Sequence, residues 1–166
     1  MTIRAGILTT SDRGSRGERA DTSAATIREL LAGIGADVVR YEVVPDNREV
    51  ISDRLCAWAD SGDVDLILTT GGTGLAARDV TPEATRDAID REAPGIAEAM
   101  RAEGLRHTPM AMLSRGTAGI RGSCLIVNLP GSEKGARESL AAVLAALPHA
   151  VELLRGQTEH GAPREG

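Results

Sequence analysis

The chain has 166 residues, of which 42% are hydrophobic, 26% charged and 1% aromatic, and its formal net charge is −5. This length suits one domain, and the apolar content excludes an intrinsically disordered chain. Basic residues scattered among an excess of acidic ones, together with the scarcity of aromatic rings, argue against a nucleic-acid partner.

Four short aliphatic segments have the length of β-strands. In chain order they are 3–10 (IRAGILTT), 37–44 (DVVRYEVV), 64–70 (VDLILTT) and 124–131 (CLIVNLPG). Three are apolar at consecutive positions, which is typical of strands buried on both faces of a parallel sheet, and the second partly alternates.

Segments with helical periodicity lie between these strands. Three of these segments each place their apolar residues on one face of a helix. The residues are Ile27, Leu30, Leu31 and Ile34 in the first, Ile51, Leu55 and Trp58 in the second, and Leu140, Val143, Leu144 and Leu147 in the third. Helix starts are indicated by Asp46 with Glu49 as a capping box, by Thr81 as an N-cap before Pro82 at the first helical position, and by Ser132 as the cap of the last long helix. The less regular segment 105–122 predicts a loop, a short strand and a turn.

Strands and helices alternate along the chain, which predicts a three-layer α/β/α sandwich with a mainly parallel central sheet. We expect a single domain over residues 1–155. The polar segment 156–166 has no periodicity, and we expect a frayed C-terminal tail there.

Other features narrow the class of protein. No segment approaches the roughly 20 apolar residues of a membrane span, and the N-terminus lacks a signal-peptide core, so we expect a cytoplasmic protein without membrane association. Cys56 and Cys124 lie far apart in apolar segments and are expected to be reduced core thiols. The three histidines, His107, His149 and His160, show no metal-ligand spacing, which argues against a zinc site.

Three predicted strands end in small polar residues and glycines. The ends read Thr9-Thr10-Ser11-Asp12, Thr69-Thr70-Gly71-Gly72 and Asn128-Leu129-Pro130-Gly131. The carboxyl ends of parallel strands meet at one edge of a sheet, which is where open α/β sheets bind ligands. Because glycines allow backbone amides to approach a phosphate closely, this edge predicts a phosphate-binding site.

The glycine-rich segment 68–85 (LTTGGTGLAARDVTPEAT) narrows the kind of phosphate site. No Gly-Lys-Ser/Thr follows the glycines, which excludes a Walker A loop. The stretch 72–77 (GTGLAA) matches a dinucleotide-binding pattern and leaves a nicotinamide-dependent oxidoreductase as one alternative. That pattern requires a helix to open inside the glycine run, whereas Pro82 predicts a later helix start.

Arg78 and Asp79 lie in this loop. An arginine can bind a phosphate, and an aspartate among phosphates is commonly a Mg²⁺ ligand. The residues alone leave structural alternatives open: an exposed Arg78-Asp79 ion pair, a helix cap at Asp46, a turn at Ser11 and Asp12, and a solvated side chain at Lys134.

With these motifs in view, residues 3–150 resemble the MogA and MoaB proteins of molybdenum cofactor biosynthesis, together with the related domains of animal gephyrin and its plant counterpart. The most specific element is the pattern T-G-G-T-G-x-x-x-R-D-x-T-P-E in segment 69–85. Supporting motifs are Ser11-Asp12, Pro45-Asp46, Leu113-Ser114-Arg115 and Asn128-Leu129-Pro130-Gly131.

The resemblance implies a molybdopterin adenylyltransferase. In that reaction the terminal phosphate of molybdopterin attacks the α-phosphate of ATP, with Mg²⁺, and pyrophosphate leaves. The resemblance implies that Asp46 and Asp79 are catalytic residues and Mg²⁺ ligands. Residues expected to bind the substrates are Ser11, Asp12, Thr70, Gly71, Gly72, Thr73, Gly74, Arg78, Ser114, Arg115, Asn128, Pro130, Gly131, Ser132 and Lys134.

The resemblance also implies an assembly and a partner. The family forms homotrimers, or hexamers in the MoaB branch, and a single-domain member passes its product to a separate molybdate-inserting protein. The alternative function is a non-catalytic molybdopterin-binding or scaffold protein of the MoaB type. The residues leave open the branch, MogA or MoaB, and the metal, molybdenum or tungsten.

Overall fold

The computed structural model describes residues 2–156, and at its centre is a six-stranded sheet with the order β2-β1-β3-β6-β5-β4. The parallel strands are β1 (Ile3–Thr10), β2 (Ala36–Val44), β3 (Leu66–Thr70) and β6 (Cys124–Leu129). The strands β5 (Ala118–Arg121) and β4 (Arg91–Glu92) complete one edge in antiparallel pairing. The sheet is therefore mainly parallel, as predicted.

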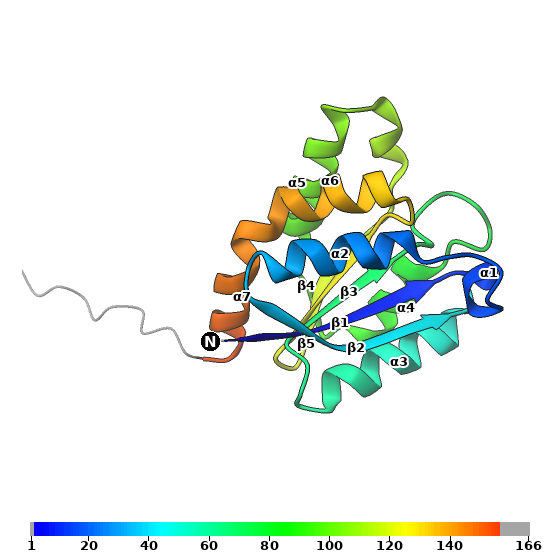
Figure 1. Cartoon of the computed structure of the whole chain (residues 1–166). Helices are drawn as coiled ribbons and strands as arrows, with labels where there is room; N and C mark the ends of the chain where they lie inside the picture. The colour runs from blue at the N-terminus through cyan, green and yellow to red at the C-terminus, as the bar shows by residue number, and fades with distance from the viewer. Residues whose placement is uncertain (1, 157–166) are drawn as a thin grey trace, which may run out of the picture.

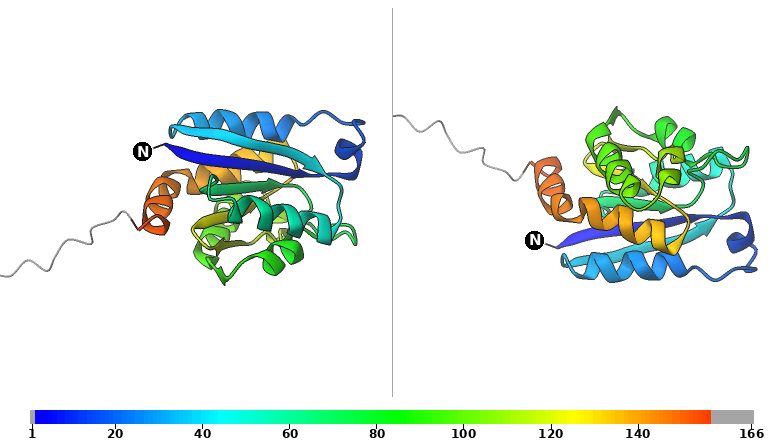
Figure 2. Two further views of the ribbon diagram at one scale, coloured as in Figure 1. Left: turned by 90° about the horizontal axis from the view of Figure 1, so that it is seen from below. Right: turned by 90° about the horizontal axis from the view of Figure 1, so that it is seen from above.

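Helices cover both faces of the sheet (Figure 1 and Figure 2). One face carries α2 (Thr22–Ala32), α5 (Pro94–Leu105), α6 (Glu133–Val143) and α7 (Leu147–Leu154), and the other carries α3 (Arg48–Asp60) and α4 (Thr81–Ala88). The short α1 (Asp12–Ser15) follows β1, and 3-10 turns form at Pro109–Leu113 and Leu144–Ala146. This arrangement confirms the three-layer sandwich.

The two inner strands, β3 and β6, are buried along their whole length. Successive side chains of a strand point to opposite faces, so Leu66 and Leu68 join one hydrophobic core while Ile67 joins the other. This double burial explains why the sequence is apolar at consecutive positions there. Both cysteines are free thiols; Cys124 is buried as predicted, whereas Cys56 is only half-buried.

Two predicted helix starts are wrong in detail. The N-cap of α3 is Asn47, whose side chain accepts a hydrogen bond from Val50 N at 3.0 Å, so Asp46 does not form the predicted capping box. Thr81 is the first residue of α4 and not its cap. Ser132 caps α6 as predicted, accepting from Gly135 N at 3.0 Å. Because Asn47 is the cap, the Asp46 side chain is not used in capping and can take part in the site described below.

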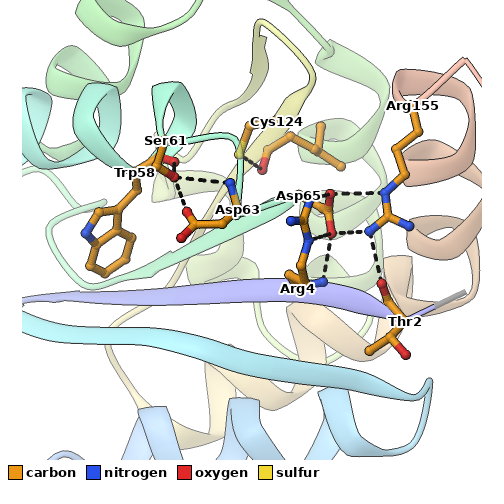
Figure 3. A network of polar contacts seen from close by, with 9 residues as sticks. Thr2, Arg4, Trp58, Ser61, Asp63, Asp65, Cys124 and Arg155 are labelled. Atoms are coloured by element: carbon orange, nitrogen blue, oxygen red, sulfur yellow. Dashed lines mark hydrogen bonds and ion pairs between the residues drawn. The ribbon is translucent and has the colours of Figure 1, made fainter.

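At the amino-terminal edge of the sheet, Asp65 connects the first strand to the end of the last helix (Figure 3). Its carboxylate accepts hydrogen bonds from Arg4 N at 2.8 Å, from Arg4 Nη2 at 2.9 Å and from Arg155 Nε at 3.0 Å. Arg155 Nη2 also donates to Asp65 and to Thr2 O. Burial by itself raises the pKa of Asp65, but the bonds from the two arginines outweigh burial and lower the pKa far below its ordinary 3.8.

The described part of the chain ends just after this contact. Apart from Gly156, the predicted frayed tail, 156–166, lies outside the described residues. Within residues 2–156, every helix is too short or too polar to cross a bilayer.

Candidate functional site

A pocket of about 280 Å³ opens at the carboxyl edge of the sheet. Its lining includes Asp12 and Arg13 of α1, the short helix on the right of Figure 1. Its walls come from the ends of β1, β2 and β3, the segment before α2, and the turn after β6. Ten predicted site residues line it: Ser11, Asp12, Asp46, Thr70, Gly71, Gly72, Arg78, Asp79, Gly131 and Ser132. Segments far apart in sequence meet here because parallel strands end on one side of the sheet.

The floor of the pocket depends on two glycines directly after β3. Gly71 and Gly72 have φ values of +101° and +68°, which L side chains rarely adopt. A Cβ at Gly71 would lie 2.4 Å from Thr10 O, and one at Gly72 would lie 2.3 Å from Thr81 Oγ1. Glycine is therefore required at both positions for the loop to close against β1 and α4.

The glycine run does not open a helix. β3 ends at Thr70 and α4 begins at Thr81, so Arg78 and Asp79 lie in a long connecting loop. In the dinucleotide-binding pattern the helix begins within the glycines. The geometry here therefore removes the support that the GTGLAA match gave to a nicotinamide-dependent oxidoreductase.

Asp12 and Asp46 hold each other in place across the ends of β1 and β2. Asp12 N donates to Asp46 Oδ2 at 3.1 Å, and Asp46 N donates to Asp12 Oδ1 at 2.8 Å. Burial raises the pKa of Asp46 above its ordinary 3.8, the hydrogen bond from Asp12 N opposes the rise, and the charges of Asp12 and Asp79 add to it. Neighbouring negative charges of this kind favour a bound cation.

Asp79 is fixed inside the loop, where its Oδ2 accepts a hydrogen bond from Ala76 N at 3.0 Å. Arg115 supports the same loop from outside the pocket. Its guanidinium donates to Gly74 O at 2.8 Å and to Asp79 O at 2.6 Å, and it pairs with Glu83. The Arg115 side chain, predicted to bind a phosphate, is thus occupied in holding Asp79.

The other predicted site residues lie outside this pocket. Thr73 is buried and Gly74 is half-buried in the loop, and Lys134 extends into solvent 3.9 Å from Glu138. A second pocket of about 210 Å³, next to α5 and α6, is lined by Ser114, Asn128 and Pro130 among others.

The amide of Asn128 is fully engaged within the protein. Its Nδ2 donates to Thr69 Oγ1 at 3.0 Å and to Thr85 Oγ1 at 2.9 Å, and its Oδ1 accepts from Thr117 N at 3.1 Å. Asn128 therefore joins β6, β3 and α4 below the site.

Three charged residues of the pocket wall, Arg13, Arg19 and Asp21, were not predicted from the sequence. Asp21 caps α2 and accepts hydrogen bonds from Thr9 Oγ1 at 2.6 Å and from Tyr41 OH at 2.5 Å. Burial, and then the hydrogen bond to Asp21, raise the pKa of Tyr41 to about 12. The only sequence signal for these residues was the polar run that follows β1.

Comparison with known proteins agrees with this architecture. Residues 6–149 match a family described as a probable molybdopterin binding domain. The chain is 45% identical over 158 residues to a Helicobacter pylori protein named molybdopterin adenylyltransferase, covering 94% of this chain and 90% of that protein. It is 38% identical over 176 aligned positions to a protein of the same name from Escherichia coli, covering 98% and 90%.

A solved structure is similar along nearly its whole length. The crystal structure of the molybdopterin biosynthesis enzyme MoaB from Thermus thermophilus is 63% identical, with a TM-score of 0.88, and the match covers 93% of this chain and 97% of that one. An open α/β sheet with a glycine-lined polar pocket at its carboxyl edge defines a class of ligand-binding domain. Within that class, the chain belongs to the MogA/MoaB family of molybdenum cofactor biosynthesis proteins.

Proposed function

We propose that this protein is a molybdopterin adenylyltransferase, which transfers AMP from ATP to the terminal phosphate of molybdopterin. The observation that carries this proposal is that Asp46 and Asp79, from two different loops, line one pocket with Gly71 and Gly72. The relatives named molybdopterin adenylyltransferase support the activity.

The reaction joins two polyanions. An oxygen of the molybdopterin phosphate attacks the α-phosphorus of ATP, the new P–O bond forms, and the bond to the pyrophosphate leaving group breaks. The attacking phosphate is already ionised near neutral pH, so the protein needs no strong base. Its tasks are to hold both phosphates in line and to offset their repulsion.

The residues of the pocket fit Mg²⁺, which prefers oxygen ligands and is commonly bound by one or two carboxylates plus substrate phosphates and water. Asp46 and Asp79 would hold the ion, which supplies positive charge against the phosphates when bound. Within residues 2–156, no three His, Cys, Asp or Glu side chains gather closely enough to bind a metal by themselves. Binding of the ion should therefore depend on the nucleotide.

The backbone amide of Gly72 and the capped start of α6 support phosphate binding by Gly72, Gly131 and Ser132. The Gly71 amide donates to Leu129 O at 3.1 Å, so Gly71 would contribute by letting the ligand approach closely. Ser11, Asp12, Thr70 and Arg78 complete the proposed substrate contacts in this pocket. Ser114 and Pro130, in the second pocket, stay candidates for binding the pterin, whereas Asn128 would support that pocket from below because its amide is engaged within the protein. We also propose a homotrimer, which sedimentation can test, and transfer of the product to a separate molybdate-inserting protein.

The test is pyrophosphate release from molybdopterin and Mg-ATP by the wild-type protein and two variants, Asp79→Asn and Asp46→Asn. Asparagine keeps an acceptor for the loop amides but removes the charge, so each variant should lose about 100-fold or more in kcat. Asp53→Asn is the matched control, because Asp53 is exposed on α3 outside the pocket.

Molybdopterin binding, measured separately, should persist in the Asp79→Asn variant. Wild-type activity in both pocket variants would refute the proposed roles. A wild-type protein that binds molybdopterin but releases no pyrophosphate would instead identify the non-catalytic binding function.

A further inference from the structure

Three arginines that line the pocket lack the carboxylate partner that most arginines of residues 2–156 have. Most arginines within residues 2–156 form an ion pair with Asp or Glu. Arg13, Arg19 and Arg78 form none in that part of the chain, although all three are exposed and line the pocket at the carboxyl edge. Three guanidinium groups that form no ion pair within the described chain thus line the site.

The lack of pairing is notable because carboxylates are abundant in the same wall. These carboxylates already accept hydrogen bonds: Asp12 and Asp46 from each other's backbone amides, Asp79 from Ala76 N, and Asp21 from Thr9 and Tyr41. The arginine donors are therefore left for a ligand. A guanidinium presents a planar fork of N–H groups that matches two oxygens of a phosphate.

The segment that carries Arg13 and Arg19 is held at both ends. Ser11 N donates to Val44 O at 2.9 Å, which fixes the start of the segment to β2. At its other end, Asp21 accepts from Thr9 on β1 and from Tyr41 on β2. Because the backbone is already positioned, a ligand that binds the two arginines pays little conformational entropy for ordering the segment.

The number and placement of the arginines indicate a polyphosphate. Arg13 and Arg19 approach the pocket from the β1–α2 connection, and Arg78 comes from the loop after β3. A triphosphate can contact cations on two sides of a pocket, whereas a monophosphate would require all three guanidinium groups to converge on one phosphorus centre. The carboxylates in the wall oppose such a ligand, so these cations are needed to offset them.

We infer that Arg13 and Arg19 bind the triphosphate of ATP, with Asp21 as the residue that positions their segment. This inference rests on the proposed adenylyl transfer, since that function supplies the nucleotide.

The test is steady-state kinetics of Arg13→Gln, Arg19→Gln and the double variant, with ATP and molybdopterin varied in turn. Loss of one charge-assisted contact should raise the KM for ATP about tenfold, and the double variant should show about a 50-fold rise or more. The KM for molybdopterin should change less than about twofold. Arg13→Lys should recover part of the loss, because lysine keeps the charge but not the fork.

Arg16→Gln is the matched control. Arg16 belongs to the same segment and is also exposed, but it pairs with Glu18 at 3.1 Å and lies outside the pocket. This control should behave as wild type. Thermal melting should be unchanged in every variant, since neither Arg13 nor Arg19 forms a side-chain ion pair in residues 2–156.

A second measurement separates this inference from the proposed function. Calorimetric titration with inorganic tripolyphosphate should show binding to the wild type and a loss of about tenfold in each single variant. If the wild type fails to release pyrophosphate but shows this pattern, the proposed function fails and polyphosphate binding by the arginines stands.

The inference is overturned in either of two ways. The first is that the wild type is active, but the double variant has the same KM for ATP and the same affinity for tripolyphosphate as the wild type. The second is a rise in the KM for molybdopterin with an unchanged KM for ATP, which would assign the arginines to the pterin phosphate.

Discussion

Gly72 and Gly35 provide a matched pair for testing the glycine loop, because their φ values are +68° and +70°. An L side chain in this left-handed region costs about 1–2 kcal/mol at either position. A Cβ at Gly35 meets nothing within 4 Å, whereas one at Gly72 lies 2.3 Å from Thr81 Oγ1. Thr81 is fully buried and its hydroxyl lies 3.1 Å from Thr10 Oγ1, so it cannot move aside without losing that hydrogen bond.

We therefore expect Gly35→Ala to lower the free energy of unfolding by about 1–2 kcal/mol. Gly72→Ala should lower it by about 2–5 kcal/mol, since overpacking adds roughly 1–3 kcal/mol to the backbone strain. The assay is urea unfolding at fixed protein concentration, followed by the fluorescence of Trp58, which is the only tryptophan and is buried.

A second substitution tests whether the Thr81 hydroxyl causes the extra cost. Thr81→Ala removes the oxygen that a Cβ at position 72 would contact. The cost of Gly72→Ala, measured as the loss in free energy of unfolding, should therefore be smaller in the Thr81→Ala background than in the wild type. Equal costs for the two glycine variants would refute the steric argument. The steric argument would also be refuted if Gly72→Ala lowered the free energy of unfolding by the same amount with and without Thr81→Ala.

Two further predictions concern ionisable side chains. Asp65→Asn should lower the free energy of unfolding at pH 7 by about 2–3 kcal/mol. This loss is smaller than that expected on breaking a fully buried ion pair, because the Arg4 side chain is 40% exposed. Because the folded-state pKa of Asp65 is lowered, the stabilisation from its carboxylate is present above about pH 4 and declines as the pH falls below about 4. In urea unfolding, the free energies of wild type and variant should therefore converge below about pH 4. Tyr41, the only tyrosine, should form tyrosinate with a pKa near 12, which absorbance can measure. The contribution of the protonated Tyr41 to the free energy of unfolding should be present below about pH 10 and decline as the pH rises toward 12. A midpoint near 10, or one unaffected by Asp21→Asn, would contradict the burial and hydrogen bond assigned to it.

The strands were predictable because their signal is local. A strand buried on both faces has apolar residues at consecutive positions, and every residue of 66–70 and 124–129 is buried in the structure. The polar members, Thr69, Thr70 and Asn128, lie toward the carboxyl ends of these strands. The cap of α3 was predicted wrongly because Asp46 and Asn47 are adjacent and both are good capping residues. The choice between them depends on Asp12, which lies 34 residues away in sequence and exchanges two hydrogen bonds with Asp46.

The candidate site was predictable only in part. The strand ends indicated where Asp46, Asp79 and the glycines would meet, and these residues do line one pocket. Arg13 and Arg19 escaped notice, because a ligand-binding arginine and a solvated one look alike in a polar run of sequence. What separates them is the absence or presence of a partner in space, which local pattern does not contain.

Composition, periodicity and the T-G-G-T-G-x-x-x-R-D-x-T-P-E motif were enough to determine the layered architecture, the edge that holds the pocket, and the family. These properties follow from short-range rules: which face of an element is apolar, and where parallel strands end. The tertiary structure alone decided that Asp46 is freed from capping, that Arg115 holds the loop, and that the guanidinium groups lining the pocket form no ion pair within residues 2–156. Each of these depends on hydrogen bonds and charges brought together from distant segments, so chain folding has to place the partners before a side chain's role is defined.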